Sequence, residues 1–167
     1  QRDPRILVDL HKMNEGHLDA TIMVAYLEQK ERTDEAFEVA MHKADHILNQ
    51  IEQMVSGNSM QIEIARTPLD LLRLKDIGKK AIMLGIENGY AIGKDLSLLQ
   101  YFRNKGIVYM TLCHNGDNDI CDSARGNGEH GGLSDFGVQV VKEMNDLGLM
   151  VDLSHASETT FYDTLKI

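Results

Sequence analysis

Cysteines, basic residues and long apolar segments are all scarce in this sequence of 167 residues. Two cysteines, Cys113 and Cys121, are too few for a disulfide framework, so we expect two free thiols, with a single bridge as the alternative. The net charge of −9 argues against binding to nucleic acid or to an anionic membrane, because both need a basic patch. No apolar run reaches the roughly 18 residues of a transmembrane helix, so none is expected.

The N-terminal segment, QRDPRILVDL, lacks the charged and then apolar parts of a signal peptide. A trimmed or mature chain would begin in the same way, so the sequence leaves the compartment open. Hydrophobic residues make up 43% of the chain and charged residues 26%, which is typical of a globular domain. The length suits one domain.

Short apolar runs of strand length alternate with amphipathic segments. The predicted strands are residues 20–27, 81–86, 107–113 and 149–153. The predicted helices are a short piece before Gly16 in the connection from Arg2, and then residues 33–55, 67–77, 94–105, 134–147 and 157–165. After the first connection the order is β-α-α-β-α-β-loop-α-β-α, which predicts a parallel sheet of four strands.

The clearest predicted helix spans residues 33–55. Its apolar side chains recur three and four residues apart: Phe37, Ala40, Met41, Ala44, Leu48, Ile51 and Val55. We expect Thr33 to cap its first turn and the segment Ser56-Gly57-Asn58 to end it. Ser134 is expected to cap the helix at residues 134–147, and Pro68 to occupy the first turn of its own helix.

Three of the predicted strands run into a side chain that can bind a metal or transfer a proton. These side chains are Glu87, His114 and His155. The C-terminal ends of parallel strands gather on one face, so we expect the three to meet there. Taken alone, each also has a structural interpretation, as a carboxylate that caps a turn or as a hydrogen-bonded core histidine. Asp152, near the last of them, faces the helix layer or supports a ligand, and we assign it no role.

Residues 115–132 form a long, polar, glycine-rich segment, NGDNDICDSARGNGEHGG. A loop of this length in a compact domain is usually functional or disordered. His130 is a candidate to reach a substrate as part of a lid, but a mobile surface histidine is the favoured interpretation. Asp117, Asn118 and Asp122 lie near the strand ends and receive no role.

Two further histidine patterns imitate metal motifs. His17 and Asp19 spell His-x-Asp, but they precede a strand and therefore lie at its N-terminal end, away from the expected site. His42 and His46 are four residues apart on a helix, a spacing that can bind zinc. Both lie off the apolar stripe of that helix, so we expect them to be exposed to solvent.

The number of strands falls short of a closed barrel. A barrel of eight strands needs roughly 250 residues, and the last predicted unit ends at Ile167 without a following strand. We therefore predict an α/β fold in which the chain forms about half of a (β/α)8 TIM-type barrel. Residues 1–167 are expected to be a single partial domain, truncated at both ends.

Three stretches resemble the membrane (renal) dipeptidase family of zinc metallopeptidases, family M19. They are LGIENGYAIGKDLSLLQYF, GIVYMTLCHNGDNDICDSA and GLSDFGVQVVKEMNDLGLMVDLSHAS. The resemblance is dense from Leu84 to Ser157 and extends more weakly back to about Val8. It implies a (β/α)8-type barrel that hydrolyses dipeptides with two zinc ions at the C-terminal ends of its strands.

The resemblance also implies roles for the strand-end residues. Glu87 corresponds to the glutamate that bridges both zinc ions, His155 to a histidine ligand, and His114 to the histidine that binds the substrate carbonyl. The residue types suit this chemistry. A carboxylate has two oxygens to share, a zinc-bridging hydroxide attacks the amide, and an imidazole donates a hydrogen bond to the developing oxyanion.

The chain departs from the family pattern at both ends. The family's His-x-Asp metal motif is expected before Gln1. Its later histidine, and the arginine and aspartate that hold the dipeptide, are expected after Ile167. The resemblance thus gives only Glu87 and His155 as metal ligands, and implies a central fragment of a dipeptidase with part of its active site.

Two other functions stay open at this point. The chain can be an inactive fragment that associates with further copies, because a half-barrel exposes sheet edges and an apolar face. We expect a homo-oligomer on that ground. It can also be a non-catalytic barrel relative that serves as a binding module, which the joint presence of Glu87, His114 and His155 disfavours. Zinc content separates these cases, since an intact site should hold about two ions per chain and a fragment few or none.

Overall fold

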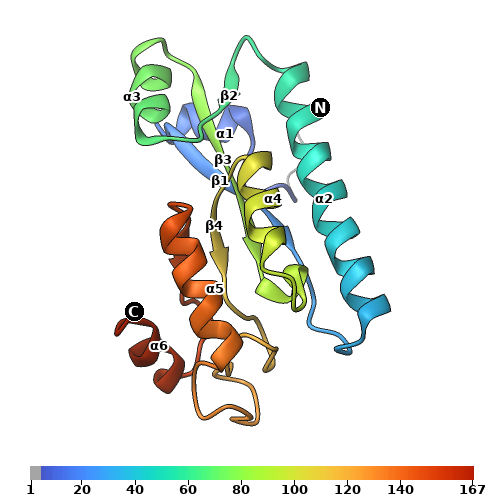
Figure 1. The fold of residues 1–167 in the computed structure, drawn as a ribbon. Coiled ribbons are helices and arrows are strands. Elements are labelled where there is room, and N and C mark those ends of the chain that lie inside the picture. Colours follow the sequence, from blue (N-terminus) through green and yellow to red (C-terminus); the bar gives the residue numbers. More distant parts are fainter. Residues whose placement is uncertain (1–4) are drawn as a thin grey trace.

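The computed structural model describes residues 5–167 and contains a five-stranded sheet with helices packed against it (Figure 1). The strands are β1 (Ala20–Tyr26), β2 (Ile62–Ile64), β3 (Lys80–Glu87), β4 (Ile107–Thr111) and β5 (Met150–Asp152). Their order is β1-β3-β4-β5, with β2 beside β3, and every pair is parallel. The predicted parallel α/β architecture is therefore confirmed.

Strand β2 was not predicted, so the expected count of four strands is wrong. Its three residues are too few to show a strand period in the sequence. It pairs with residues 80–82 of β3, whereas β4 pairs with β3 from Leu84 onward. Because β1 occupies the other edge of β3, β2 and β4 share one edge, and β2 widens only the N-terminal end of the sheet.

The connections form six α-helices and one 3-10 helix within residues 5–167. They are α1 (Leu10–Glu15), α2 (Asp34–Gly57), α3 (Pro68–Asp76), the 3-10 helix η1 (Gly89–Ile92), α4 (Ser97–Lys105), α5 (Asp135–Asp146) and α6 (Glu158–Thr164). In this part of the chain, none of them has both the length and the apolar character needed to cross a membrane. The short helix predicted before Gly16 is α1, and residues 2–4 of the predicted connection lie outside the described part.

Side-chain caps begin the main helices where the sequence predicted them. The hydroxyl groups of Thr33 and Ser134 each accept a backbone N–H in the first turn of α2 and α5, and Pro68 is the first residue of α3. The helix predicted from Lys94 begins later, at Ser97. The carboxylate of Asp95 accepts the N–H of Ser97, and this local bond holds the residues before α4 in a turn.

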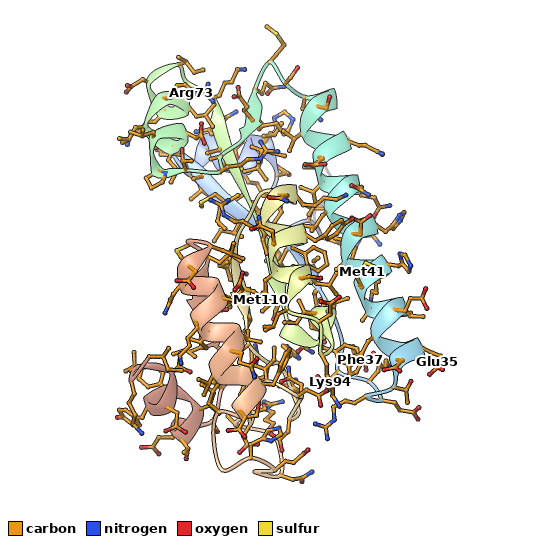
Figure 2. All side chains as sticks on the ribbon, in the orientation of Figure 1. Glu35, Phe37, Met41, Arg73, Lys94 and Met110 are labelled. Carbon is orange, nitrogen blue, oxygen red and sulfur yellow. The ribbon has the colours of Figure 1, made fainter. Side chains whose placement is uncertain are left out.

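The main core lies between the sheet and helices α2, α4 and α5, which lie in front of the sheet in Figure 1. Phe102 of α4 and Met110 of β4 are fully buried there. From α2, Phe37 contacts the ring of Tyr90 with centroids 5.4 Å apart, and Met41 packs against the same core (Figure 2). Truncating Phe102 to alanine is expected to cost about 3–5 kcal/mol of stability.

The opposite face of the sheet carries the row of side chains that builds the site. Tyr26, Glu87, Thr111 and Asp152 are register partners across β1, β3, β4 and β5, so their side chains share one face at the C-terminal end. This face stays open to solvent, since Tyr26 is 40% exposed and Met150 is 56% exposed. The open face corresponds to the interior of a barrel that this sheet only half encloses.

Candidate metal centre

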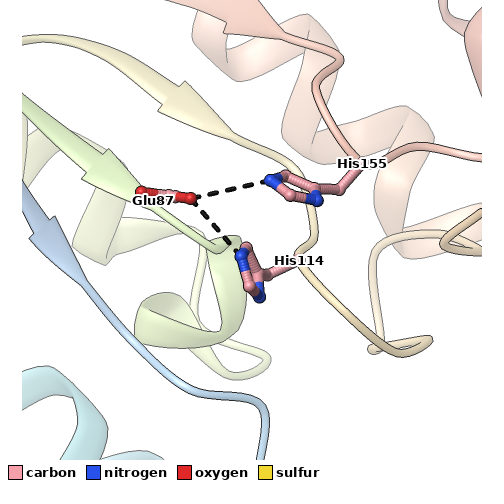
Figure 3. A group of neighbouring side chains, drawn as sticks. All are labelled: Glu87, His114 and His155. Atoms are coloured by element: carbon pink, nitrogen blue, oxygen red, sulfur yellow. Dashed lines mark ion pairs between the residues drawn. The ribbon is translucent and has the colours of Figure 1, made fainter. Parts of the chain in front are cut away.

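The three strand-end residues meet at one point (Figure 3). Glu87 is the last residue of β3, while His114 and His155 follow β4 and β5. One carboxylate oxygen, Glu87 Oε1, lies 3.5 Å from His114 Nε2 and 3.6 Å from His155 Nε2. The two imidazole rings are tilted against each other, with centroids 4.2 Å apart. The convergence predicted from the strand ends is present in the structure.

The donor atoms of this group fit a metal ion. One ligand atom from each of Glu87, His114 and His155 lies within 4.8 Å of the others. Two imidazole nitrogens and a carboxylate oxygen are donors that zinc accepts. The side chains are 29%, 15% and 35% exposed in that order, so the group is reachable from solvent. In residues 5–167 this is the one group of at least three His, Cys, Asp or Glu side chains with this geometry.

His155 reaches the group through an unusual backbone conformation. Its φ angle is +67°, a left-handed value that side chains with a Cβ adopt only at a cost of about 1–3 kcal/mol. Hydrogen bonds maintain it, because the carbonyl of His155 accepts the N–H of Ala124 at 2.8 Å and lies 3.1 Å from Ser123 Oγ. Ser123 Oγ also contacts the carbonyl of His114, so one hydroxyl lies between both histidine backbones.

Tyr26 is a member of the site that the sequence analysis missed. Its ring meets the ring of His114 edge-on, with centroids 4.9 Å apart and an angle of 67° between the planes. It is also the register partner of Glu87. Tyr26 ends the observed β1, but the strand predicted over residues 20–27 places it inside the strand, so the rule that identified the other three residues did not select it.

Asp152, whose role the sequence left open, holds the end of β5 against β4. Its carboxylate accepts the hydroxyl of Thr111 at 2.5 Å and both the N–H and the hydroxyl of Ser154. Burial acts to raise the pKa of Asp152, but the bonds from Thr111 and Ser154 outweigh it and lower the pKa below its usual value. Asp152 is therefore a half-buried anion that fixes the turn leading to His155.

Two carboxylates order the long loop between β4 and α5. Asp117 accepts the backbone N–H groups of Ser123, Asn127, Gly128 and Glu129. A Cβ at Gly126 would lie 1.6 Å from Asp117 Oδ1, so only glycine allows the carboxylate to approach this closely. The loop is thus built around a half-buried carboxylate that accepts four backbone N–H groups.

The second carboxylate, Asp122, accepts the N–H groups of His130 and Gly132. The ring of His130 is half-buried, and its Nε2 lies 2.8 Å from the carbonyl oxygen of Asn118. The expected mobile surface histidine is therefore wrong, because the ring bonds to the loop's own backbone. It does not reach the metal group either.

The other histidine patterns lie away from the site, as expected. Asp19 precedes β1 at the N-terminal end and pairs with Lys75 and Lys80. His42 and His46 are exposed on α2. The two cysteines are free, as predicted, and both are buried. A hydrogen bond with Cys113, together with burial, raises the pKa of the Cys121 thiol far above its usual range, so that thiol stays protonated.

Comparisons with known proteins agree on one family. A family model described as membrane dipeptidase, peptidase family M19, matches residues 1–167. Dipeptidase tcpJ of Claviceps purpurea is 31% identical over 96% of this chain and 39% of its own length. Dipeptidase verJ of Clonostachys rogersoniana is 31% identical over 95% of this chain and 43% of its own length. The crystal structure of the probable dipeptidase PvdM from Pseudomonas aeruginosa is 28% identical, with a TM-score of 0.91 over 99% of this chain and 44% of that chain.

The chain spans about two fifths of the length of these curated relatives. The solved family members have a TIM-barrel fold, and the chain covers 44% of one and 50% of another, so the predicted partial barrel is confirmed. M19 is a family of metallopeptidases, which implies a metal cofactor, and the donor set described above suits one. On the match over its whole length, the chain belongs to the membrane dipeptidase family, peptidase family M19.

Proposed function

We propose that this chain carries part of the active centre of a zinc-dependent dipeptidase. The observation that carries the proposal is the convergence of Glu87, His114 and His155 at the C-terminal ends of three strands. Active sites of barrel enzymes lie at this end of the sheet. Membership of the family and the dipeptidase names of the relatives support a dipeptide as the substrate.

In this proposal Glu87 and His155 hold zinc, and Glu87 has a second oxygen with which to serve two ions. Zinc supplies a Lewis acid that acidifies water and polarises the scissile carbonyl. His114 donates a hydrogen bond from Nε2 to the carbonyl oxygen as negative charge develops on it. The edge of Tyr26 against its ring restricts the orientation of His114, so that Nε2 stays directed into the site. The partial domain over residues 1–167 would contribute these groups to the complete barrel.

The substitution Glu87→Gln tests this function in the full-length protein. It keeps the shape of the side chain and removes the anionic oxygen pair, so we expect dipeptide hydrolysis to be abolished and the zinc content to fall. Glu38→Gln is the matched control, because Glu38 is exposed on α2 and pairs only with His42 among the described residues. Undiminished turnover by Glu87→Gln would exclude the assignment.

A second property is favoured by the open face of the sheet. Ile22, Tyr26 and Met150 are 40%, 40% and 56% exposed there, and β1 and β5 are edge strands. We infer that the 167-residue chain by itself associates with further copies through this face, since exposed apolar surface and free strand edges favour pairing. Light scattering coupled to size-exclusion chromatography checks this, and a strictly monomeric chain at high concentration would contradict it.

A further inference from the structure

Asn88, the residue after Glu87, is a fully buried amide with every hydrogen-bonding position in use. Its Nδ2 donates to the carbonyl of Leu27 at 3.1 Å and to Gln29 Oε1 at 3.3 Å. Its Oδ1 accepts the N–H of Tyr90 at 3.1 Å and the Nδ2 of Asn118 at 3.1 Å. An amide offers two donors and two acceptor positions, so none is left over. Asn88 thereby joins the end of β1 to the end of β3 and to the loop after β4.

Asn118 is saturated in the same way. Its Nδ2 donates to Asn88 Oδ1 and, at 2.8 Å, to the carbonyl of Leu112, while its Oδ1 accepts the N–H groups of Ile120 and Cys121. Its exposed fraction is 1%, and that of Asn88 is 0%. The bond to Leu112 holds the chain just before His114, as the bond to Asn88 holds it just after Glu87. A direct bond between two side chains therefore connects the backbones that present Glu87 and His114.

We propose that the Asn88–Asn118 amide pair is a positioning device that fixes Glu87 relative to His114, and that through the position of Glu87 it sets the affinity of the site for zinc. The proposal rests on the proposed function, because it concerns the same metal group. Neither asparagine touches the group itself. Buried hydrogen bonds behind a ligand fix its orientation, and removing them typically costs about 10–100-fold in metal affinity.

A simpler role for Asn88 makes a different prediction. Its φ angle is +88°, which asparagine tolerates better than most residues and glycine adopts freely. If Asn88 only supplied this turn, Asn88→Gly would leave the stability of the fold unchanged or raise it, and zinc affinity would not change. If the amide positions Glu87, the same substitution weakens zinc binding although it relieves the backbone.

The key variant is Asn118→Asp. It has nearly the same shape and keeps an oxygen for the N–H groups of Ile120 and Cys121. It removes both donors, however, and places an oxygen against Asn88 Oδ1 and the carbonyl of Leu112. Asn127→Asp is the matched control, because it makes the same chemical change at an exposed position of the same loop. If Asn118→Asp does not fold, Asn118→Ser replaces it, since serine retains a single donor.

Two measurements on the purified protein test whether the amide pair positions the metal group. Zinc affinity is measured by competition with a chromophoric chelator, at a temperature where circular dichroism shows each variant to be folded. The ring nitrogen signals of His114 and His155 are recorded without metal by long-range ¹H–¹⁵N correlation. We expect Asn118→Asp and Asn88→Gly each to weaken zinc binding by about 10–100-fold and to move the His114 signals. Asn127→Asp should change neither.

The double variant of Asn88→Gly and Asn118→Asp tests whether the two asparagines act on the metal group through the bond between them or independently of each other. Residues that act through one bond are not additive, so the double variant should lose no more affinity than the weaker-binding single variant. Unchanged zinc affinity in folded Asn118→Asp and Asn88→Gly would overturn the proposal. If the unaltered protein bound no zinc, the proposed function would be refuted. The histidine signals alone would then decide whether the amide pair positions His114. Movement in Asn118→Asp but not in Asn127→Asp supports the device, and identical spectra refute it.

Discussion

The two ends of the sheet carry similar residue types and use them differently. At the N-terminal end, Asp19 pairs with Lys75 and Lys80, and Glu63 pairs with Arg73 and Lys79. Hydrogen bonds and charge from these partners lower the pKa values of both Asp19 and Glu63. Both of these carboxylates therefore already have cations beside them.

At the C-terminal end, the ion-pair partners of Glu87 within residues 5–167 are His114 and His155. An imidazole can be neutral and present a lone pair, whereas a lysine or guanidinium cannot. Glu87 has no lysine or arginine as an ion-pair partner among the described residues, whereas the charges of Asp19 and Glu63 are already compensated by such partners. The difference between a metal group and a structural ion pair therefore lies in the partner of the carboxylate.

The largest expected effect is on zinc affinity, and it is measured by removing one carboxylate at each end of the sheet in separate variants. Glu87→Gln should weaken zinc binding by more than about 100-fold, because a ligand contributes more than the bonds behind it. Glu63→Gln should leave zinc affinity unchanged. Isothermal titration with zinc checks both. Equal losses from the two variants would mean that the contrast between the ends does not govern binding.

The left-handed backbone at His155 allows zinc binding and fold stability at the C-terminal end of the sheet to be separated by one substitution. His155→Gly removes a ligand and should greatly weaken zinc binding, yet it relieves the φ angle of +67° and should raise the metal-free unfolding free energy by about 1 kcal/mol. His42→Gly is the control, since glycine inside a helix costs about 1 kcal/mol. Urea denaturation measures both. A loss of stability in His155→Gly as large as in His42→Gly would contradict the strain argument.

The sequence predicted the convergence of Glu87, His114 and His155 because it depends only on strand direction. Each residue follows an apolar run, and parallel strands place their ends together whatever the details. Tyr26 was overlooked because it lies inside the predicted strand 20–27, where an aromatic side chain is expected to belong to the core, whereas the observed strand ends at Tyr26. Strand β2 was missed because three residues carry no period.

Other features of the site depend on contacts between distant parts of the chain. The bond between Asn88 and Asn118 joins residues 30 positions apart, and neither residue differs in sequence from an ordinary turn asparagine. The saturation of both amides is visible only in three dimensions. The same holds for the loop that follows His114, which is ordered by Asp117 and Asp122 although its composition is typical of a mobile segment.

A smaller effect concerns acid and the loop around Asp117. Burial acts to raise the pKa of Asp117, but its bonds from the N–H groups of Ser123, Asn127, Glu129 and Gly128 lower it overall. A lowered folded pKa means that this carboxylate stabilises the fold above its unfolded pKa of about 3.9 and loses that contribution as the pH falls through the lower folded value.

Asp117→Asn should therefore cost about 1–3 kcal/mol at pH 7 and almost nothing at a pH below the folded pKa. Chemical denaturation across this range measures the difference between the variant and the unaltered protein. Asp34→Asn, at an exposed position in the first turn of α2, is a control for the general effect of removing one acidic group. A penalty that is constant with pH would show that the charge of Asp117 is not what orders the loop.

The smallest effect is expected from the His-x-Asp pattern at the N-terminal end. Asp19→Asn removes one partner of Lys75 and Lys80 on the surface, and exposed ion pairs contribute little and are screened by salt. We expect a slight loss of stability that disappears at high salt, and no change in zinc affinity. Denaturation at low and high salt, with zinc titration of the same samples, tests both. A fall in zinc affinity comparable to that of Glu87→Gln would mean that a carboxylate between two lysines can still bind a cation, which contradicts the contrast between the two ends of the sheet.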